Sequence, residues 1–285
     1  MTQSLAIVRT PEALTEQVDA WRRAGKRIAL VPTMGALHEG HLSLVRLARA
    51  HADVVVASVF VNPKQFGPTE DLDRYPRQEA RDAELLASVG CDLLFAPTVE
   101  AMYPQGFATT VSVTGVSEGL CGGARPGHFD GVATVVAKLL IAARPHVAVF
   151  GEKDYQQLQV IRRLNADLNI GVDILGAPIV READGLAMSS RNAYLSTTDR
   201  AIAACLPQVM AAVRDRLEAG APVADALAAG TAALLAAGVS SVDYLELRDA
   251  RSLAPLEQLS GAARLLVAAR VGATRLIDNM AVTPR

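Results

Sequence analysis

Two histidines separated by a glutamate and a glycine form the most informative segment of this chain. His38-Glu39-Gly40-His41 lies between an apolar run at residues 28–31 and a helix-like stretch at residues 41–52. A helix N-terminus carries a partial positive charge and unpaired N–H groups, so it suits phosphate and other anions. The imidazoles add hydrogen-bond donors, and the glycine lets a ligand approach the backbone. The segment predicts a site that polarises nucleotide phosphates.

Surface histidines and zinc ligands are the alternative interpretations of this segment. Zinc is disfavoured, because the His-Glu-x-x-His signature places its imidazoles one turn apart on a helix. Here two residues separate the histidines, Gly40 interrupts the helix, and no Cys-x-x-Cys pair exists. The cysteines (Cys91, Cys121 and Cys205) are scattered and odd in number, which indicates a reducing compartment and no disulfide framework.

Two polar segments follow apolar runs elsewhere in the chain. Asn62-Pro-Lys-Gln-Phe-Gly67 reads as a turn that would place Lys64 and Gln65 beside a polar ligand. Gly151-Glu-Lys-Asp154 opens a helix after another apolar run, so Lys153 would reach a phosphate as a point charge. Asp154 has a second interpretation as a simple helix N-cap.

Two basic loops are weaker candidates. Met188-Ser-Ser-Arg-Asn192 offers hydroxyls and the Arg191 guanidinium for an anion, although such runs also occur in ordinary loops. Residues 122–128 read as a flexible basic loop in which His128 is a candidate to face the ligand. His51 and His146 are expected to be structural or surface residues.

Helices and strands alternate through the first part of the chain. Strands are expected at residues 28–31, 53–61, 92–96, 146–150 and 172–175, and helices at 11–24, 41–52, 78–89, 131–144 and 155–168. This alternation predicts an α/β fold with a Rossmann-like, doubly wound parallel sheet. Ligands bind at the carboxyl ends of such strands. The histidine loop, residues 62–77 and residues 151–154 should therefore converge there.

A second, smaller domain is expected after the first. Residues 197–237 are alanine-rich and helical with a break at 220–222, and strand-like pieces follow at 242–248, 265–269 and 274–280. We therefore expect a Rossmann-like nucleotide-binding domain at residues 1–179. Residues 180–285 would form an α+β domain that closes over the site.

Composition narrows the function class. No apolar run approaches the roughly 20 residues that span a bilayer, and the N-terminal residues 1–9 lack the pattern of a signal peptide. The net charge is −2 and aromatic residues make up only 4%, which disfavours nucleic acid as a partner. A cytoplasmic protein without a membrane partner is expected.

Taken in order, these segments resemble the pantothenate synthetase (pantoate–β-alanine ligase) family. The resemblance spans essentially the whole chain and is carried by residues 31–41 (VPTMGALHEGH), 60–67 (FVNPKQFG), 151–157 (GEKDYQQ), 181–192 (READGLAMSSRN) and 243–248 (DYLELR). The histidine motif alone indicates only the wider superfamily of nucleotidyltransferases and class I aminoacyl-tRNA synthetases.

The resemblance implies a two-step, ATP-dependent condensation that serves coenzyme A biosynthesis. The carboxylate of pantoate attacks the α-phosphorus of ATP, giving pantoyl-adenylate and pyrophosphate. The amine of β-alanine then attacks the activated carbonyl, giving pantothenate and AMP. Magnesium should accompany ATP, and a homodimer formed through the N-terminal domain is implied.

The resemblance also implies roles for individual residues. His41, His38 and Lys153 would be catalytic, with His41 as a proton donor or charge stabiliser, and Gln65 and Gln157 would hold pantoate, Gln65 also lying near β-alanine. Asp82 is a weaker candidate, near the magnesium or the amine. The nucleotide would contact Met34, Gly35, Ala36, Leu37, His38, Glu39, Gly40, His41, Gly151, Glu152, Lys153, Asp154, Val180, Met188, Ser189, Ser190 and Arg191.

Two rival functions remain open. A different adenylyltransferase would add AMP to a phosphate ester and release a dinucleotide-like product instead of free AMP. A non-catalytic ATP sensor would be stabilised by ATP without turnover. Product identity separates these alternatives from the ligase.

Overall fold

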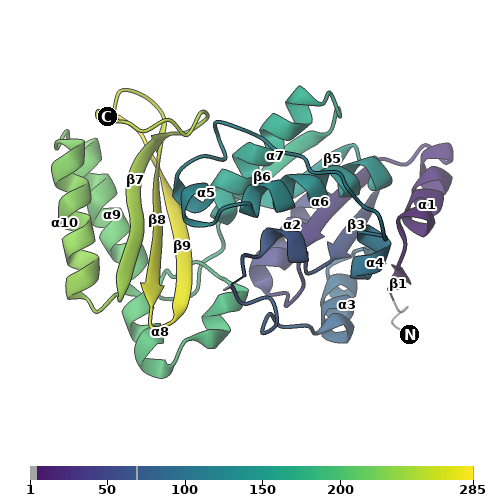
Figure 1. Ribbon diagram of the computed structural model, residues 1–285, viewed down its shortest axis with the longest axis horizontal. Coiled ribbons are helices and arrows are strands. Elements are labelled where there is room, and N and C mark those ends of the chain that lie inside the picture. The colour runs from purple at the N-terminus through teal and green to yellow at the C-terminus, as the bar shows by residue number, and fades with distance from the viewer. Residues whose placement is uncertain (1–4, 69, 285) are drawn as a thin grey trace.

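The structure is a computed structural model that describes residues 5–68 and 70–284. Residues 1–4, 69 and 285 lie outside the described residues. The expectations that fall on them are the start of the N-terminal segment and the outermost ends of the two expected domains. Figure 1 shows a larger sheet carried by the N-terminal part of the chain and a smaller sheet near the C-terminus.

The larger sheet is parallel throughout its described strands. Its described strands follow the spatial order β1 (Ala6–Val8), β4 (Leu93–Phe95), β3 (Val54–Val59), β2 (Ile28–Thr33), β5 (Val147–Gly151) and β6 (Asp173–Ala177). The connecting elements include α1 (Pro11–Arg23), α2 (Glu39–Arg49), α3 (Glu79–Ser88), α4 (Val99–Met102), α5 (Leu120–Ala124), α6 (His128–Ala143) and α7 (Tyr155–Asp167), with 3-10 turns η1 (Pro63–Gln65) and η2 (Glu152–Asp154).

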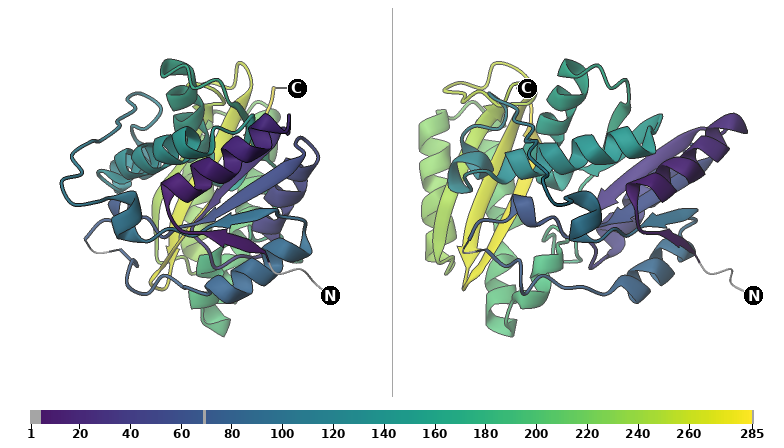
Figure 2. Two further views of the ribbon diagram at one scale, coloured as in Figure 1. Left: turned by 90° about the vertical axis from the view of Figure 1, so that its right-hand side faces the viewer. Right: turned by 45° about the vertical axis from the view of Figure 1, so that its right-hand side comes forward.

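Helices cover both faces of this sheet, because its central strands are apolar on both sides. Side chains alternate between the faces along each strand. Leu30 and Val56 pack in one buried cluster with α1, α6 and α7, whereas Val31 and Val55 pack in a second with α2 and α3. Figure 2 shows α1 lying across the sheet. Near-continuous apolar runs such as residues 54–57 are typical of a parallel sheet buried in this way.

The direction of winding reverses beside β2. From β2 the chain adds β3 and then β4 toward one edge, and afterwards returns to place β5 on the other side of β2. Loops that leave the carboxyl ends of β2 and β5 therefore diverge, and ligands bind in the crevice between such loops. The histidine loop follows β2 and residues 151–154 follow β5, so the topology brings these two segments together.

The C-terminal part is a smaller α+β unit. It contains η3 (Ser190–Tyr194), α8 (Thr197–Ala203), α9 (Cys205–Glu218), α10 (Val223–Ala236) and the antiparallel strands β7 (Ser241–Asp249), β8 (Ala263–Val271) and β9 (Thr274–Val282). One sheet face packs on α9 and α10 around its own core (Figure 1). On the opposite face, Tyr244, Leu266 and Ile277 join the core of the first part.

The fold class predicted from the sequence is confirmed, and three short elements were not predicted. β1 is a largely exposed edge strand of three residues, and α4 is a single turn. α5 occupies residues 122–124 of the segment expected as a flexible loop at 122–128, so the loop between α5 and α6 is shorter than expected. The buried Gln156 holds the start of α5: its amide donates to the carbonyls of residues 116, 118 and 119 and accepts from the Cys121 N–H.

No helix in the described ranges combines the length and the apolar character that crossing a bilayer requires.

Candidate active site

The predicted ligand-binding loops meet in one pocket at the carboxyl ends of β2, β3 and β5. The predicted residues that line this pocket are Met34, His38, Gly40, His41, Gln65, Gly151, Lys153, Asp154, Gln157, Val180, Met188, Ser189, Ser190 and Arg191. Loops of the parallel sheet and the segment leading into the C-terminal part therefore contribute to a single cavity.

His38 and His41 are held in matching tautomers. Nδ1 of His38, the N-cap of α2, accepts the Gly40 N–H at 3.2 Å, and Nδ1 of His41 accepts the His38 N–H at 3.3 Å. A neutral imidazole carries one N–H, so these contacts place the proton of each ring on Nε2. A Cβ at Gly40 would lie 2.8 Å from the His38 ring, which explains the glycine between the histidines. The pocket thus receives two N–H donors.

Both imidazoles are neutral at physiological pH. Burial lowers the pKa of His38 to about 4, and the nearby Lys153 charge contributes to this shift. Burial likewise lowers the pKa of His41 to about 3, with a smaller contribution from His38. The pair therefore stabilises negative charge by hydrogen bonding and not as imidazolium ions.

The same shifts predict a loss of stability in mild acid. The unfolded histidines bind protons near pH 6.5, whereas folded His38, His41 and His128 bind them near pH 3 to 4. The unfolded state then binds more protons, so the free energy of unfolding should fall as the pH drops below 6.5. The decline approaches about 1.4 kcal/mol per pH unit for each histidine. Urea denaturation at pH 7.5, 6 and 5 measures it.

A variant separates the histidines from other titrating groups. His128→Gln should give a shallower decline between pH 6.5 and 5 than the unsubstituted protein. Equal stability at pH 7.5 and pH 5 would contradict this account of the buried imidazoles.

The C-terminal sheet fixes the turn that carries Lys153. Nδ2 of Asn279 in β9 donates to the carbonyl oxygens of Glu152 and Lys153, both at 2.9 Å. Arg264 in β8 pairs with the Glu152 carboxylate at 2.9 Å. Glu152 does not line the pocket, so its side chain does not take the nucleotide-contacting position expected for it; it anchors the turn instead.

His128 and Arg125 hold the backbone at Gln65. Nδ1 of His128 lies 2.9 Å from the Gln65 carbonyl, and Nε2 lies 3.0 Å from Nη1 of Arg125. Because arginine only donates, His128 accepts at Nε2 and donates from Nδ1. Arg125 also forms a two-point ion pair with Glu70, at 2.7 and 2.6 Å. His128 reaches the pocket, but protein groups occupy both of its ring nitrogens.

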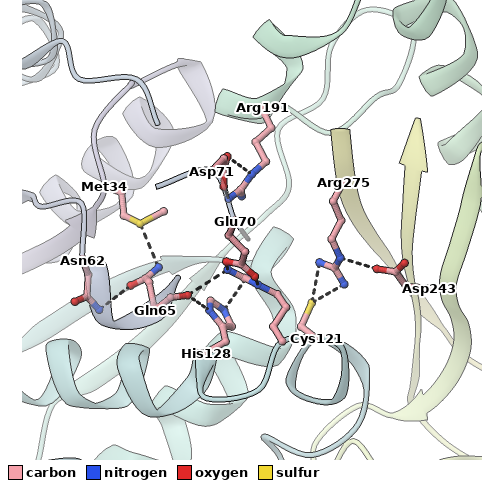
Figure 3. Close-up of polar contacts among 11 residues, drawn as sticks. Met34, Asn62, Gln65, Glu70, Asp71, Cys121, His128, Arg191, Asp243 and Arg275 are labelled. Atoms are coloured by element: carbon pink, nitrogen blue, oxygen red, sulfur yellow. Dashed lines mark hydrogen bonds and ion pairs between the residues drawn. The ribbon is translucent and has the colours of Figure 1, made fainter. Parts of the chain in front are cut away.

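The Met188–Arg191 segment contacts the histidine loop directly. The Ser190 hydroxyl donates to the Ala36 carbonyl at 3.1 Å. Arg191 lines the pocket, and its guanidinium donates to both carboxylate oxygens of Asp71, which lies outside the pocket lining, at 3.0 and 2.8 Å (Figure 3). A carboxylate therefore occupies the position in which this arginine would meet a phosphate.

Asp82 contacts the backbone of the histidine loop. Its buried carboxylate accepts the N–H groups of Ala36 and Leu37, each at 2.9 Å. Both oxygens are turned toward the backbone of the histidine loop, and Asp82 does not line the pocket. Asp82 therefore fixes the loop that leads into α2, and its expected place near magnesium or the amine stays a prediction.

Replacing Asp82 with asparagine should therefore damage the loop. The amide turns one acceptor into a donor facing a backbone N–H, and a lost hydrogen bond to a charged group costs about 1.5–3 kcal/mol. We expect a lower free energy of unfolding together with lower kcat. Urea denaturation and steady-state kinetics measure both. Glu84→Gln, which removes a charge from the same helix outside the pocket, is the matched control.

A metal role makes the opposite prediction for Asp82→Asn. If Asp82 bound the metal, Asp82→Asn would raise the magnesium concentration needed for activity and leave the free energy of unfolding unchanged.

Several residues of the two predicted nucleotide-binding loops act outside the pocket. The carboxylate of Glu39 is exposed and pairs with Arg46. Gly35, Ala36 and Leu37 do not line the pocket and shape the turn instead. The left-handed φ of +81° at Gly35 and +50° at Ala36 shows how tight this turn is.

Sequence reasoning missed one wall of the pocket. Val132, Val135, Val136 and Leu139 lie on one face of α6 and line it together with Phe60. The i, i+3, i+4, i+7 spacing was visible in the sequence, but the same spacing also marks an ordinary core-facing helix. Asn62 and Arg125 line the pocket as well. Asn62 lay within a predicted loop without being singled out.

The described residues contain no group of three or more His, Cys, Asp or Glu side chains that could hold a metal ion. Among them, Asp154 is the one carboxylate that lines the pocket.

The fold and the pocket define a class of protein. A doubly wound sheet places imidazole, ammonium and guanidinium donors around one crevice, and the described pocket contains no nucleophile–base pair of the serine or cysteine type. Such a site acts by positioning and charge stabilisation, as in enzymes that transfer nucleotidyl groups.

Comparisons with known proteins give the family. The family model described as pantoate-beta-alanine ligase matches residues 6–281. The pantothenate synthetase of Paramagnetospirillum magneticum is 61% identical over 284 residues, covering 100% of each chain. The crystal structure of pantothenate synthetase from Thermus thermophilus matches with a TM-score of 0.93 and 49% identity, covering 98% of this chain and 100% of that one.

A further solved structure holds ligands. The pantoate-beta-alanine ligase from Francisella tularensis, complexed with beta-gamma ATP and beta-alanine, matches with a TM-score of 0.83 and 34% identity, covering 97% of each chain. The chain belongs to the pantoate-beta-alanine ligase family.

Proposed function

We propose that this protein condenses pantoate with β-alanine, using ATP and releasing AMP and pyrophosphate through a pantoyl-adenylate. The observation that carries the proposal is the pocket itself. His38, His41, Lys153 and Arg191, whose side chains carry N–H donors, all line it. ATP would lie between the histidine loop and residues 151–154, with Val180 and Met188–Arg191 closing over it.

In the first step the carboxylate oxygen of pantoate bonds to the α-phosphorus, and the bond to the pyrophosphate oxygen breaks. Negative charge grows on the leaving pyrophosphate and on the α-phosphoryl oxygens. Neutral N–H donors of His38 and His41 stabilise this charge together with Lys153. Such donors contribute most in a site that excludes water. Arg191 would exchange the Asp71 carboxylate for phosphate oxygens.

In the second step the amine of β-alanine attacks the activated carbonyl, and AMP leaves with the bonding electron pair. The same donors stabilise the charge that returns to the phosphate. The proton lost by the amine goes to solvent or to a phosphate oxygen. This scheme needs no covalent enzyme intermediate, in keeping with a site built for positioning.

The pantoate position follows from the walls of the pocket. The α6 face and Phe60 provide an apolar surface for the two methyl groups of pantoate. Gln65 and Gln157 line the same pocket and supply amide groups for its carboxylate and hydroxyl oxygens. A small, branched hydroxy acid matches both features.

Magnesium would arrive with ATP. It retains water readily and is often bound through phosphates and one or two carboxylates. Asp154 is the pocket residue suited to that contact, and when bound the ion would neutralise phosphate charge.

The domain division, the cellular location and the oligomeric state expected from the sequence are part of the same proposal. We divide the chain into a nucleotide-binding domain at residues 1–179 and a closing domain at 180–285, in keeping with the second hydrophobic cluster, which residues of the C-terminal part form among themselves. The three cysteines are free thiols, which agrees with a cytoplasmic location. A homodimer through the N-terminal domain is proposed from the family resemblance, and sedimentation equilibrium tests it.

Product identification tests the function. Incubation with ATP, magnesium, pantoate and β-alanine should give pantothenate, AMP and pyrophosphate in equal amounts by mass spectrometry. A dinucleotide-like product formed from a phosphate ester would support the rival adenylyltransferase. Stabilisation by ATP without turnover would support a sensor.

A further inference from the structure

A chain of hydrogen bonds runs from a residue outside the pocket to one of its substrate-facing amides. The Tyr103 hydroxyl donates to Oδ1 of Asn62 at 2.8 Å, and Nδ2 of Asn62 donates to Oε1 of Gln65 at 3.1 Å. Nε2 of Gln65 donates to Sδ of Met34 at 3.1 Å. Figure 3 shows the part of this chain from Asn62 to Met34.

The orientation of the Asn62 amide is fixed by four partners. Besides Tyr103 and Gln65, the Lys64 N–H donates to Oδ1 at 3.3 Å, and Nδ2 also donates to the Gly131 carbonyl at 3.0 Å. A flipped amide would set donor against donor at Lys64 and acceptor against acceptor at Gly131. Asn62 is 1% exposed, so water cannot relieve these contacts.

Close packing of η1 on α6 keeps these partners in place. A Cβ at Gly131 would lie 2.2 Å from the Lys64 carbonyl oxygen, so only glycine permits this approach. The Gly131 carbonyl is therefore held within reach of Asn62, and the amide cannot relax away from it.

The fixed Asn62 amide decides which end of Gln65 faces the ligand. Oε1 of Gln65 is committed to Asn62, so its Nε2 group is the end presented to Met34 and the pocket. A thioether is a weak acceptor. A carboxylate or hydroxyl oxygen of a ligand is a better acceptor for the same N–H donors, so a ligand would gain a stronger hydrogen bond by replacing the Met34 thioether.

We propose that Tyr103 is a positioning residue that acts through Asn62 to make Gln65 a donor, and that it thereby selects an acidic or hydroxylated substrate at this position. The inference rests on the proposed function, because it takes Gln65 as the residue that holds pantoate. Tyr103 does not line the pocket. Its hydroxyl reaches the substrate through Asn62 and Gln65, whereas its ring lies beside Phe60, a contact that a phenylalanine at position 103 would keep.

The surroundings of Tyr103 suit this role. Its ring packs on Phe107, with centroids 5.1 Å apart, and the Lys64 ammonium lies 5.3 Å from the ring centroid. Burial raises the pKa of the Tyr103 hydroxyl well above its usual range, so the group keeps its proton and remains a donor.

The test is Tyr103→Phe, which keeps the ring and removes only the hydroxyl. We expect the KM for pantoate to rise about three- to tenfold, the effect of one buried hydrogen bond, while the KM for ATP stays within twofold. Asn62→Asp should raise the KM for pantoate further, because it replaces the donor that faces Oε1 of Gln65. Thermal melts confirm that each variant is folded.

A double-mutant cycle separates positioning from a general structural effect. In a Gln65→Ala background, Tyr103→Phe should change the KM for pantoate less than twofold. Tyr155→Phe is the matched control, since its hydroxyl donates to the Ala250 carbonyl at the same 2.8 Å outside the pocket. It should leave the KM for pantoate unchanged.

The possible contrary results distinguish failure of the Tyr103 inference from failure of the proposed pantoate position. Additive effects of Tyr103→Phe and Gln65→Ala, equal rises in both KM values, or no effect of Tyr103→Phe would overturn the inference. If Gln65→Ala itself leaves the KM for pantoate unchanged, the proposed substrate position fails instead.

Discussion

Replacing His41 with alanine is expected to lower kcat by a factor of about 10² to 10³, the usual cost of removing one donor to transition-state charge. The expectation follows from the Nε2 proton that the His38 N–H contact imposes on this ring. A charge-stabilising donor acts mainly in the transition state, so the KM for ATP should change little. Single-turnover measurement of pyrophosphate release gives the rate directly.

Two further variants sharpen the His41 prediction. His41→Gln can place an amide N–H near the position of Nε2, so it should recover part of the lost rate. His51→Ala removes an exposed imidazole whose ring hydrogen-bonds only to the Leu47 carbonyl among the described residues, and it should leave kcat unchanged. Equal losses for His41→Ala and His51→Ala would refute the assignment of His41.

Replacing Lys153 with alanine is expected to give the second large effect. Asn279 fixes the turn beneath Lys153 through two carbonyl contacts, so the backbone that carries the ammonium is held in place before any ligand arrives. Removing a preorganised charge from a phosphate site should lower kcat/KM for ATP by about 10²-fold. Unlike His41→Ala, this variant should also raise the KM for ATP, because the charge contacts the bound nucleotide as well as the transition state.

The lysine prediction has its own control. Lys26→Ala removes an exposed ammonium outside the pocket lining and should have kinetics within twofold of the unsubstituted protein. If Lys153→Ala matches Lys26→Ala, Lys153 does not contact phosphate. Loss of thermal stability in Lys153→Ala without a change in kcat/KM would indicate a structural role.

The sequence predicted the fold and the loops well because both follow from local patterns. Apolar runs such as residues 54–57, separated by helical segments, require a buried parallel sheet. A parallel sheet then places the loops after β2, β3 and β5 at one edge. The meeting of His41, Gln65 and Lys153 in one pocket follows from this topology.

Local sequence patterns could not predict the direction in which individual side chains point. Glu39 and Glu152 belong to the predicted loops, but partners distant from the pocket hold their carboxylates. Asp82 lies 45 residues from Leu37, whose N–H it accepts. Only the folded chain shows these pairings, because each depends on a tertiary contact.

The residues that hold the pocket-lining residues in place could not be predicted from the sequence for the same reason. Asn279 in β9 holds the Lys153 turn, and Tyr103 holds Asn62, across long separations in sequence. Neither residue belongs to a short motif. A motif identifies residues that touch ligands, whereas their supports are placed by packing.

Release of pyrophosphate from ATP and magnesium by pantoate, without β-alanine, tests the central claim most directly. We expect a pantoate-dependent burst equal to the number of active sites, followed by sustained turnover to AMP once β-alanine is added. Pyrophosphate release that requires β-alanine, or that never depends on pantoate, would contradict an adenylate formed in this pocket.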